Sequence, residues 1–255
     1  MNKSISIVIP TYNEAKNIES LIERIHAALS QNNITYELIF IDDHSIDKTV
    51  EVITSLSLLY PIILSTKQGK KGKAYSLFEG FQYAQYEHIA IIDADLQYPP
   101  EGIVAMLEKL DSVDIVVANR KRFHAGLLRK ILSSGFRTAF GRMLFGLNHD
   151  IQSGLKVFKQ EVLQVVRFTP SSPWTFDLEF LHRAQEAGFI IGNHDITFEK
   201  RIEGKSKVNL LHTVYEIGSR AVGLKLSAMH PQSTDPIALD TMKGAGVHYK
   251  KRKYV

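Results

Sequence analysis

Residues 88–101, with the sequence HIAIIDADLQYPPE, run an apolar segment directly into two aspartates separated by one residue. The apolar part, residues 89–92, predicts a buried strand, and Asp93 and Asp95 follow where that strand should end. Side chains two residues apart on a strand point to the same face, so both carboxylates can reach one site. Mg²⁺ or Mn²⁺ takes oxygen ligands and combines carboxylates with phosphate oxygens. The pattern therefore favours a metal and phosphate site, although acids at a strand end also form solvated turns or helix caps.

Working outward, the same kind of apolar, β-branched segment recurs along the first half of the chain, with helical patterns between the copies. The predicted strands cover residues 5–9, 37–41, 62–64, 89–92 and 115–118. Helices are expected to begin near Glu14, Thr49 and Ala74, and after the Pro99-Pro100 pair. Strands that are apolar on both faces and separated by helices indicate an α/β fold, with a mostly parallel sheet sandwiched by helices.

Open α/β sheets bind ligands beyond the carboxyl ends of their strands. The residues expected at those ends are Pro10, Tyr12, Glu14, Asp42, Asp43, Asp93, Asp95 and Arg120. One edge of the sheet should therefore gather carboxylates, an aromatic ring and a guanidinium. For Asp42 and Asp43 a helix-capping turn is an equal alternative, as it is for the nearby Asp47 and Thr49.

Composition narrows the possible partners. The chain has 255 residues, is 44% hydrophobic, contains no cysteine and carries a net charge of +4, with a pI of about 9.0. The absence of cysteine excludes disulfides and thiolate metal sites, and the mild positive charge favours anionic partners. We expect no secretory leader. The longest uncharged, largely apolar stretch covers residues 56–65 and is interrupted by Pro61. It is far shorter than the roughly 18 apolar residues that a membrane-spanning helix needs.

Two later segments differ in amino-acid composition from the first half of the chain, which is predicted to form the sheet. Residues 127–147 interleave leucine and phenylalanine with arginine and lysine, as interfacial helices do, although core helices broken at Gly135 would give a similar pattern. Residues 228–255 contain few large apolar side chains and end in Lys250-Lys-Arg-Lys253. We expect this second segment to be a flexible basic tail, either solvated or attracted to anionic lipid.

Taken together, seven stretches in order resemble the family 2 inverting glycosyltransferases of the GT-A fold, most closely the branch of dolichyl-phosphate mannose synthase and other polyprenyl-phosphate glycosyltransferases. They are SIVIPTYNE, ELIFIDDHSIDKT, GKAYSLFEGF, IAIIDADLQYPPE, DIVVANRKRF, DIQSGLKVF and FEKRIEGKSKV. The likeness covers roughly residues 4–210, and it implies a GT-A (Rossmann-like) domain over residues 1–227 in which residues 127–147 form amphipathic membrane-interface helices. One departure is His44, which stands where the family's D-D-G-S turn has glycine.

The resemblance also implies roles for individual residues. Donor-nucleotide binding falls to Pro10, Tyr12, Glu14, Asp42, Asp93 and Lys207. Metal binding falls to Asp93, Asp95 and Gln97, with Mg²⁺ or Mn²⁺ as the cofactor. Catalytic roles fall to Asp95, Arg120, Asp150 and Arg201, and the acceptor phosphate would meet Arg129, Arg137 and Ser153.

The implied reaction is a metal-dependent, inverting transfer of a hexose from a nucleotide-diphosphate sugar to a polyprenyl (dolichyl or undecaprenyl) phosphate. The implied location is cytoplasmic, peripheral on the cytoplasmic face of a membrane. Three alternatives remain open: a family 2 enzyme acting on a polysaccharide or other hydroxyl acceptor, for which Asp177 or Glu179 could serve as base; a nucleotide-sugar binding protein without catalysis; and, from the basic tail alone, a nucleic-acid binder. The sequence leaves the donor base, its sugar and the lipid unspecified.

Overall fold

A computed structural model describes residues 3–122, 149–151, 153–166 and 176–199. The elements in chain order are β1 (Ser4–Thr11), α1 (Ala15–Gln31), β2 (Thr35–Asp42), α2 (Thr49–Leu56), β3 (Ile62–Thr66), α3 (Lys73–Phe81), β4 (His88–Ile91), α4 (Gly102–Lys109), β5 (Ile115–Arg122), β6 (Lys156–Lys159), α6 (Glu161–Val165), α7 (Phe176–Glu186) and β7 (Ile191–Thr197). All five predicted strands are present, and the four predicted helix starts agree to within two residues. The strand bounds also agree to within two residues, except that β5 ends four residues later than predicted.

The strands form one seven-stranded sheet in the order β3-β2-β1-β4-β6-β5-β7. Strand β6 is antiparallel to both of its neighbours, β4 and β5, while β1, β2, β3 and β4 pair in parallel and β5 pairs in parallel with β7. Six of these seven strands therefore point the same way, which confirms a mostly parallel sheet. Strands β6 and β7 are additions that the sequence did not predict, and β6 is the reversed one.

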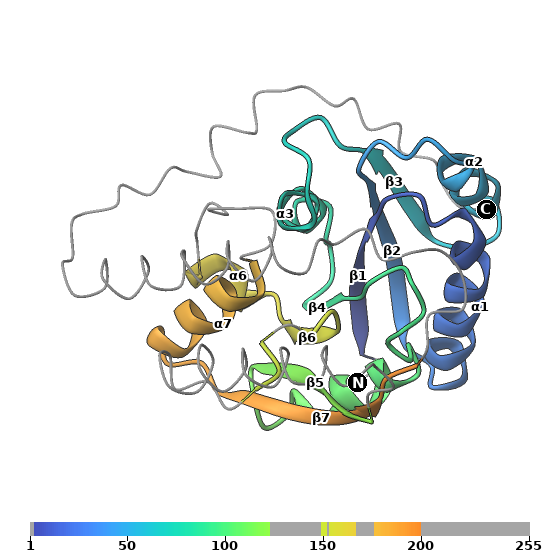
Figure 1. Ribbon diagram of the computed structural model, residues 1–255. Helices are drawn as coiled ribbons and strands as arrows, with labels where there is room; N and C mark the ends of the chain where they lie inside the picture. Colours follow the sequence, from blue (N-terminus) through green and yellow to red (C-terminus); the bar gives the residue numbers. More distant parts are fainter. Residues whose placement is uncertain (1–2, 123–148, 152, 167–175, 200–255) are drawn as a thin grey trace.

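Helices cover both faces of the sheet, as Figure 1 shows for α1 and α2 on one side and α3 on the other. Alternation along β1 makes the two cores: Ile5, Ile7 and Ile9 pack under α1, α2 and α4, whereas Val8 packs under α3, α6 and α7. Successive strand side chains point to opposite faces, so a strand covered on both sides is apolar at most positions. The buried exceptions Ser6 and Glu37 pair with each other, since the Ser6 hydroxyl donates to Glu37 Oε1 at 2.6 Å.

Several sequence predictions lie outside the described residues. They concern the segment 127–147, the tail 228–255, and the side chains of Arg129, Arg137, Arg201 and Lys207. Within the part of the chain that the structure describes, none of the helices combines the length and the apolar character that crossing a bilayer requires.

Candidate functional site

The predicted site residues gather at the carboxyl edge of the sheet. Thr11 at the end of β1 lies opposite Asp42 at the end of β2, and Asp93 follows β4. Because β6 is reversed, its amino end reaches the same edge: Lys156 lies opposite Ile91 of β4 and Val117 of β5. The reversed strand thereby delivers the segment that starts at Asp150 to the edge where the parallel strands end.

After β4, three polar side chains alternate with buried residues. Asp93, Asp95 and Gln97 are half-buried, whereas the residues between them are buried. Leu96 has a φ of +60° and turns the chain, and the Gln97 amide donates to Asp95 Oδ1 at 3.1 Å. Apolar residues fix the segment while its oxygen-bearing side chains stay accessible.

This arrangement suits a cation that shares its shell with a ligand. The described residues contain no cluster of three or more His, Asp or Glu side chains able to hold a metal. Two carboxylates and an amide oxygen would leave positions for phosphate oxygens, the usual arrangement for Mg²⁺ at nucleotide sites. The donor set fits the cofactor that the resemblance implies.

Asp93 is held by a lysine that the sequence analysis did not single out. Lys73, the first residue of α3, places its Nζ 2.6 Å from Asp93 Oδ1. Burial alone would lower the pKa of Lys73, but the charges of Asp93 and Asp177 outweigh burial and raise that pKa. Lys73 is therefore a cation throughout the physiological range.

Arg120 and Asp150 form a bidentate pair at the edge. Arg120 Nε donates to Asp150 Oδ2 at 2.6 Å and Arg120 Nη2 donates to Oδ1 at 2.9 Å, and the Asp150 side chain is fully buried. Burial would lower the pKa of Arg120, but Tyr98 and Asp150 raise it, so the guanidinium keeps its charge. The Arg120 guanidinium also lies 5.3 Å from the ring centre of Phe198, which packs edge-on against Tyr98.

A second basic group sits deeper, behind Asp150. Lys156 is fully buried and donates to Asp177 Oδ1 at 2.5 Å and to the Ser153 carbonyl. Burial lowers the pKa of Lys156, and Asp177 opposes that shift. Asp177 is thus occupied by an ion pair, and Glu179 is buried in the first turn of α7.

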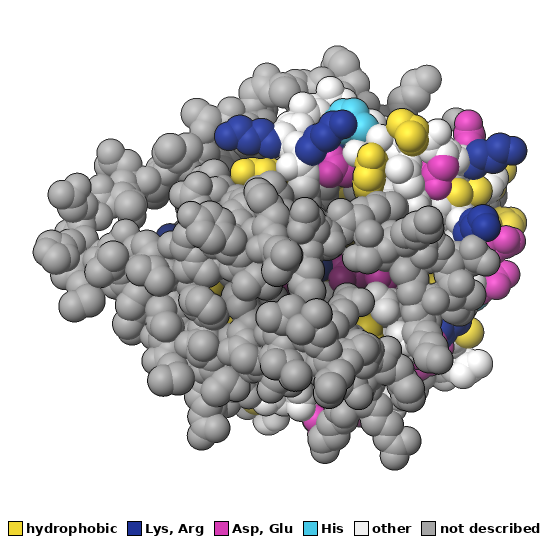
Figure 2. All heavy atoms as spheres, in the orientation of Figure 1, with side chains coloured by type: hydrophobic (Ala, Val, Ile, Leu, Met, Phe, Trp, Pro, Cys, Tyr) yellow, Lys and Arg dark blue, Asp and Glu magenta, His cyan; other side chains and the backbone are white. Residues whose placement is uncertain are grey.

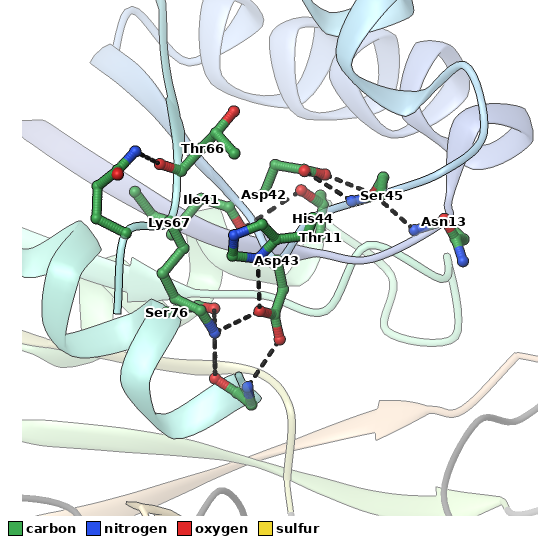
Figure 3. Close-up of polar contacts among 12 residues, drawn as sticks. Thr11, Asn13, Ile41, Asp42, Asp43, His44, Ser45, Thr66, Lys67 and Ser76 are labelled. Atoms are coloured by element: carbon green, nitrogen blue, oxygen red, sulfur yellow. Dashed lines mark hydrogen bonds and ion pairs between the residues drawn. The ribbon is translucent and has the colours of Figure 1, made fainter. Parts of the chain in front are cut away.

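The turn after β2 is built from polar contacts that Figure 3 shows together. Asp42 is 1% exposed, and its carboxylate accepts from the Ser45 amide at 2.9 Å and from the Ser45 hydroxyl at 2.5 Å. His44 has a φ of +62°, so the turn keeps the left-handed conformation for which the family uses glycine. Asp42 therefore closes its own turn before α2, whose N-cap is Lys48 and has no side-chain cap bond. A contact between Asp42 and a base stays a prediction.

Asp43 ties this turn to the loop that precedes α3. Its Oδ1 lies 2.7 Å from the Nζ of Lys67, a fully buried side chain, and its Oδ2 accepts from the Gly72 amide at 2.7 Å. Lys67 Nζ also donates to the Gly72 carbonyl and to the Ser76 hydroxyl, both at 3.1 Å. These bonds, visible in Figure 3, fix the start of α3 and hence the backbone of Lys73.

The predicted donor-binding residues of the first loop lie at the same edge. Tyr12 is 40% exposed, Pro10 is half-buried, and Glu14 Oε2 accepts from the side-chain Nδ2 of Asn17 at 2.7 Å. Ser153 is placed differently: it is buried, and its hydroxyl donates to the Leu155 carbonyl at 3.1 Å. An acceptor phosphate would reach Ser153 only if that turn opened.

Three buried or half-buried lysines, namely Lys67, Lys73 and Lys156, were missed as site residues. Their contacts join positions 20 to 24 residues apart, and one lysine cannot be told from its neighbours Lys70 and Lys71 by sequence spacing. The one available signal was a lysine inside or beside an otherwise apolar strand, as at Lys67 and Lys156. A charge in that position needs a partner.

The fold is the GT-A fold of solved glycosyltransferases. Glucosyl-3-phosphoglycerate synthase from Mycobacterium tuberculosis, solved with Mn²⁺, UDP-glucose and phosphoglyceric acid, superposes with a TM-score of 0.69 at 16% identity, covering 88% of this chain and 80% of that one. The family model described as glycosyl transferase family 2 matches residues 6–167. The chain belongs to glycosyl transferase family 2.

Two curated relatives lie in the branch that the sequence motifs indicated. Dolichol-phosphate mannosyltransferase of Pyrococcus furiosus is 32% identical over 213 residues, which cover 80% of this chain and 59% of the relative. Polyprenol monophosphomannose synthase of Mycolicibacterium smegmatis is 28% identical over 217 residues, covering 80% of each. The chain therefore spans about three fifths of the archaeal relative's length and four fifths of the mycobacterial one's.

Proposed function

We propose that the chain transfers a hexose, with inversion, from a nucleotide-diphosphate sugar to a polyprenyl phosphate. The observation that carries the proposal is the meeting of Asp93 and Asp95 with the Arg120–Asp150 pair at one sheet edge. The names of the two curated relatives support the lipid acceptor. The donor would lie with its nucleotide against Pro10, Tyr12, Glu14 and the Asp42 turn, and its diphosphate near Asp93, Asp95 and Gln97.

A bound Mg²⁺ or Mn²⁺ would stabilise the negative charge that develops on the departing nucleoside diphosphate. Arg120 would also stabilise the negative charge on the departing diphosphate, since a guanidinium can bind two phosphate oxygens at once. Arg201 and Lys207 are proposed to approach the same phosphates. All of these contributions stabilise the leaving group.

The acceptor end needs positioning more than it needs a strong base. A lipid monophosphate has a second pKa of about 6 and is already anionic at neutral pH. Asp150 is fully buried and binds Arg120 through both oxygens, which suits orientation of Arg120 better than proton removal. Arg129, Arg137 and Ser153 remain candidates for the acceptor phosphate, and residues 127–147 for contact with the cytoplasmic face of a membrane.

A hydroxyl acceptor is the second candidate, although the ion pair with Lys156 occupies the Asp177 carboxylate that would have to act as its base. Incubation with a labelled donor separates the two reactions. A radiolabelled product that partitions into organic solvent with undecaprenyl or dolichyl phosphate supports the lipid acceptor. Label that enters only water-soluble or polymeric product would establish the alternative.

The direct test combines donor binding with turnover. Among GDP-mannose, UDP-glucose and related sugars with Mn²⁺, one donor should raise the melting temperature most, since binding to the folded state stabilises by mass action. Asp95→Asn should remove the Mn²⁺-dependent part of that rise, whereas Asp150→Asn should keep donor affinity near wild type and lower turnover. Asp111→Asn is the matched control, because Asp111 bonds Lys3 beside the start of β1. Donor binding that ignores Mn²⁺ and Asp95 would refute the proposal.

A further inference from the structure

The Lys73–Asp93 pair places a positive charge beside Asp93, one of the three proposed metal ligands Asp93, Asp95 and Gln97. Lys73 Nζ lies 2.6 Å from Asp93 Oδ1, while the other carboxylate oxygen, Oδ2, faces the backbone of Gly154 so closely that a Cβ there would overlap with it. Asp93 therefore contacts an ammonium through one oxygen and faces backbone with the other, while its side chain stays 29% exposed. A cation that binds Oδ1 must share that oxygen with the ammonium or replace the ammonium.

Sharing is unfavourable because the two cations repel one another. An ammonium and a divalent ion on one carboxylate would lie within a few ångströms, where repulsion is large even at protein surfaces. A diphosphate changes this balance, since its oxygens can accept from the ammonium and coordinate the metal together. The metal and the nucleotide should then each favour the other's binding.

We propose that Lys73 is an internal counter-cation of the metal motif, which neutralises Asp93 until donor and metal bind together and then transfers its ammonium to the diphosphate. The inference rests on the proposed function and deepens it, because it assigns to Lys73 the coupling between metal and nucleotide. Lys73 is a positioning and coupling residue in this scheme, and the transferred sugar does not contact it.

The surrounding structure allows this movement of the side chain alone. The Lys73 side chain is 23% exposed, and lysine carries its charge on a flexible four-carbon stem. Its backbone stays fixed, because the Gly72 amide donates to Asp43 and Lys67 holds the Gly72 carbonyl. The fixed backbone and the mobile ammonium fit a group that exchanges one anion for another at the same edge.

The test measures Mn²⁺ binding by the electron paramagnetic resonance signal of the free ion, with GDP or UDP as the probe nucleotide. Wild-type protein should bind Mn²⁺ weakly alone and about 5- to 150-fold more tightly with the nucleotide, the usual range of coupling between two ligands. Lys73→Gln should bind Mn²⁺ alone about tenfold more tightly than wild type and lose most of that coupling. By linkage, Mn²⁺ should then raise nucleotide affinity less in Lys73→Gln than in wild type.

Two variants control for charge and for folding. Lys70→Gln removes the same charge from an exposed position three residues earlier and should leave both Mn²⁺ affinities unchanged. Lys73→Arg keeps the charge and should keep the coupling, so it remains informative if Lys73→Gln fails to fold.

The outcomes separate the inference from the proposed function. If wild type binds Mn²⁺ with nucleotide but Lys73→Gln has the same Mn²⁺ affinities as wild type, or if wild type shows no coupling, the counter-cation role is wrong. If wild type binds no Mn²⁺ even with both nucleotides, the metal-dependent function is itself wrong and the inference fails with it.

Discussion

Gly154 sets how closely the segment before β6 approaches the metal motif. An added Cβ at this position would lie 2.5 Å from Asp93 Cγ and 2.8 Å from Tyr98 Cε2, and would overlap with Asp93 Oδ2. Neither neighbour has room to yield, because Asp93 is paired with Lys73 and Tyr98 is buried. The absence of a side chain at 154 is thus a requirement of the Asp93 position.

Gly154→Ala should therefore reduce turnover more than it reduces stability. We expect a loss of about 100-fold in kcat/KM, since a displacement of roughly 1 Å at a reacting site can cost that much, with the folded state retained. Initial rates and thermal unfolding measured on one preparation check this. Gly69→Ala is the matched control because no atom lies within 4 Å of its added Cβ. Full activity in Gly154→Ala would show that the Asp93 position is not critical.

At the scale of elements, Arg24 joins three segments that are distant in sequence. From α1, its Nε and Nη2 each donate at 2.8 Å to Glu101, the residue before α4, and Nη2 donates at 3.0 Å to Glu199, after β7. The Glu199 amide donates in turn to the Gln97 carbonyl at 2.9 Å. The bridge from Arg24 thus holds the end of β7 against the metal motif.

Arg24→Met should destabilise the protein by about 1 kcal/mol or less at neutral pH, because Arg24 and Glu101 are 26% and 52% exposed and water screens the pair. Partial burial would raise the pKa of Glu101, but the hydrogen bond from Arg24, a backbone hydrogen bond and the charge of Arg24 together outweigh burial and lower that pKa. A lowered folded-state pKa adds stability above the unfolded-state value and loses it as pH falls through the folded-state value. The difference between wild type and variant should therefore be full at pH 7 and shrink below about pH 4.5.

Urea unfolding at pH 7 and at pH 3 to 4 measures that difference. A double-mutant cycle with Glu101→Gln isolates the pair, since contacting residues give non-additive effects. A difference that stays constant with pH, or strict additivity in the cycle, would contradict the assigned interaction.

For the whole molecule, the first strands of the sheet were predictable because their amino-acid patterns are typical of buried strands. Both faces of β1 and β2 are covered, so their sequences are largely apolar, apart from the buried pair Ser6 and Glu37, and are bounded by polar turns. Strand β6 was not predictable in the same way: it has four residues with a lysine at each end, and nothing local in it records that it runs antiparallel.

The site was predictable where a motif is continuous along the chain and missed where it is assembled in space. Asp93, Asp95 and Gln97 alternate with buried residues in one short segment, and sequence spacing predicted that alternation. Lys73 meets Asp93 from another element, and Lys67 meets Asp43 across 24 residues of sequence. Such contacts depend on how helices pack on the sheet, and the hydrophobic periodicity of the sequence does not predict that packing.

The overall charge makes a last prediction, about the membrane. The chain carries +4, and on the face in Figure 2 described basic and acidic side chains are interspersed along the upper rim, so no described single-sign patch dominates that face. Attraction to lipid would then depend on the basic segments of the sequence. With about 1 kcal/mol per basic residue near an anionic surface, wild type should co-sediment with vesicles containing phosphatidylglycerol at 50 mM NaCl. It should largely remain in solution with phosphatidylcholine.

Raising NaCl to 500 mM should release most of the protein, because screening shortens the range of charge interactions to a few ångströms. Replacing Lys250, Lys251, Arg252 and Lys253 with glutamine tests the tail, and replacing Arg129 and Arg137 with glutamine tests the amphipathic segment. A fall in pelleted protein for only one of these variants assigns the contact to that segment. Binding that is insensitive to salt and to lipid charge would mean that apolar insertion, rather than net charge, brings this glycosyltransferase family member to the bilayer.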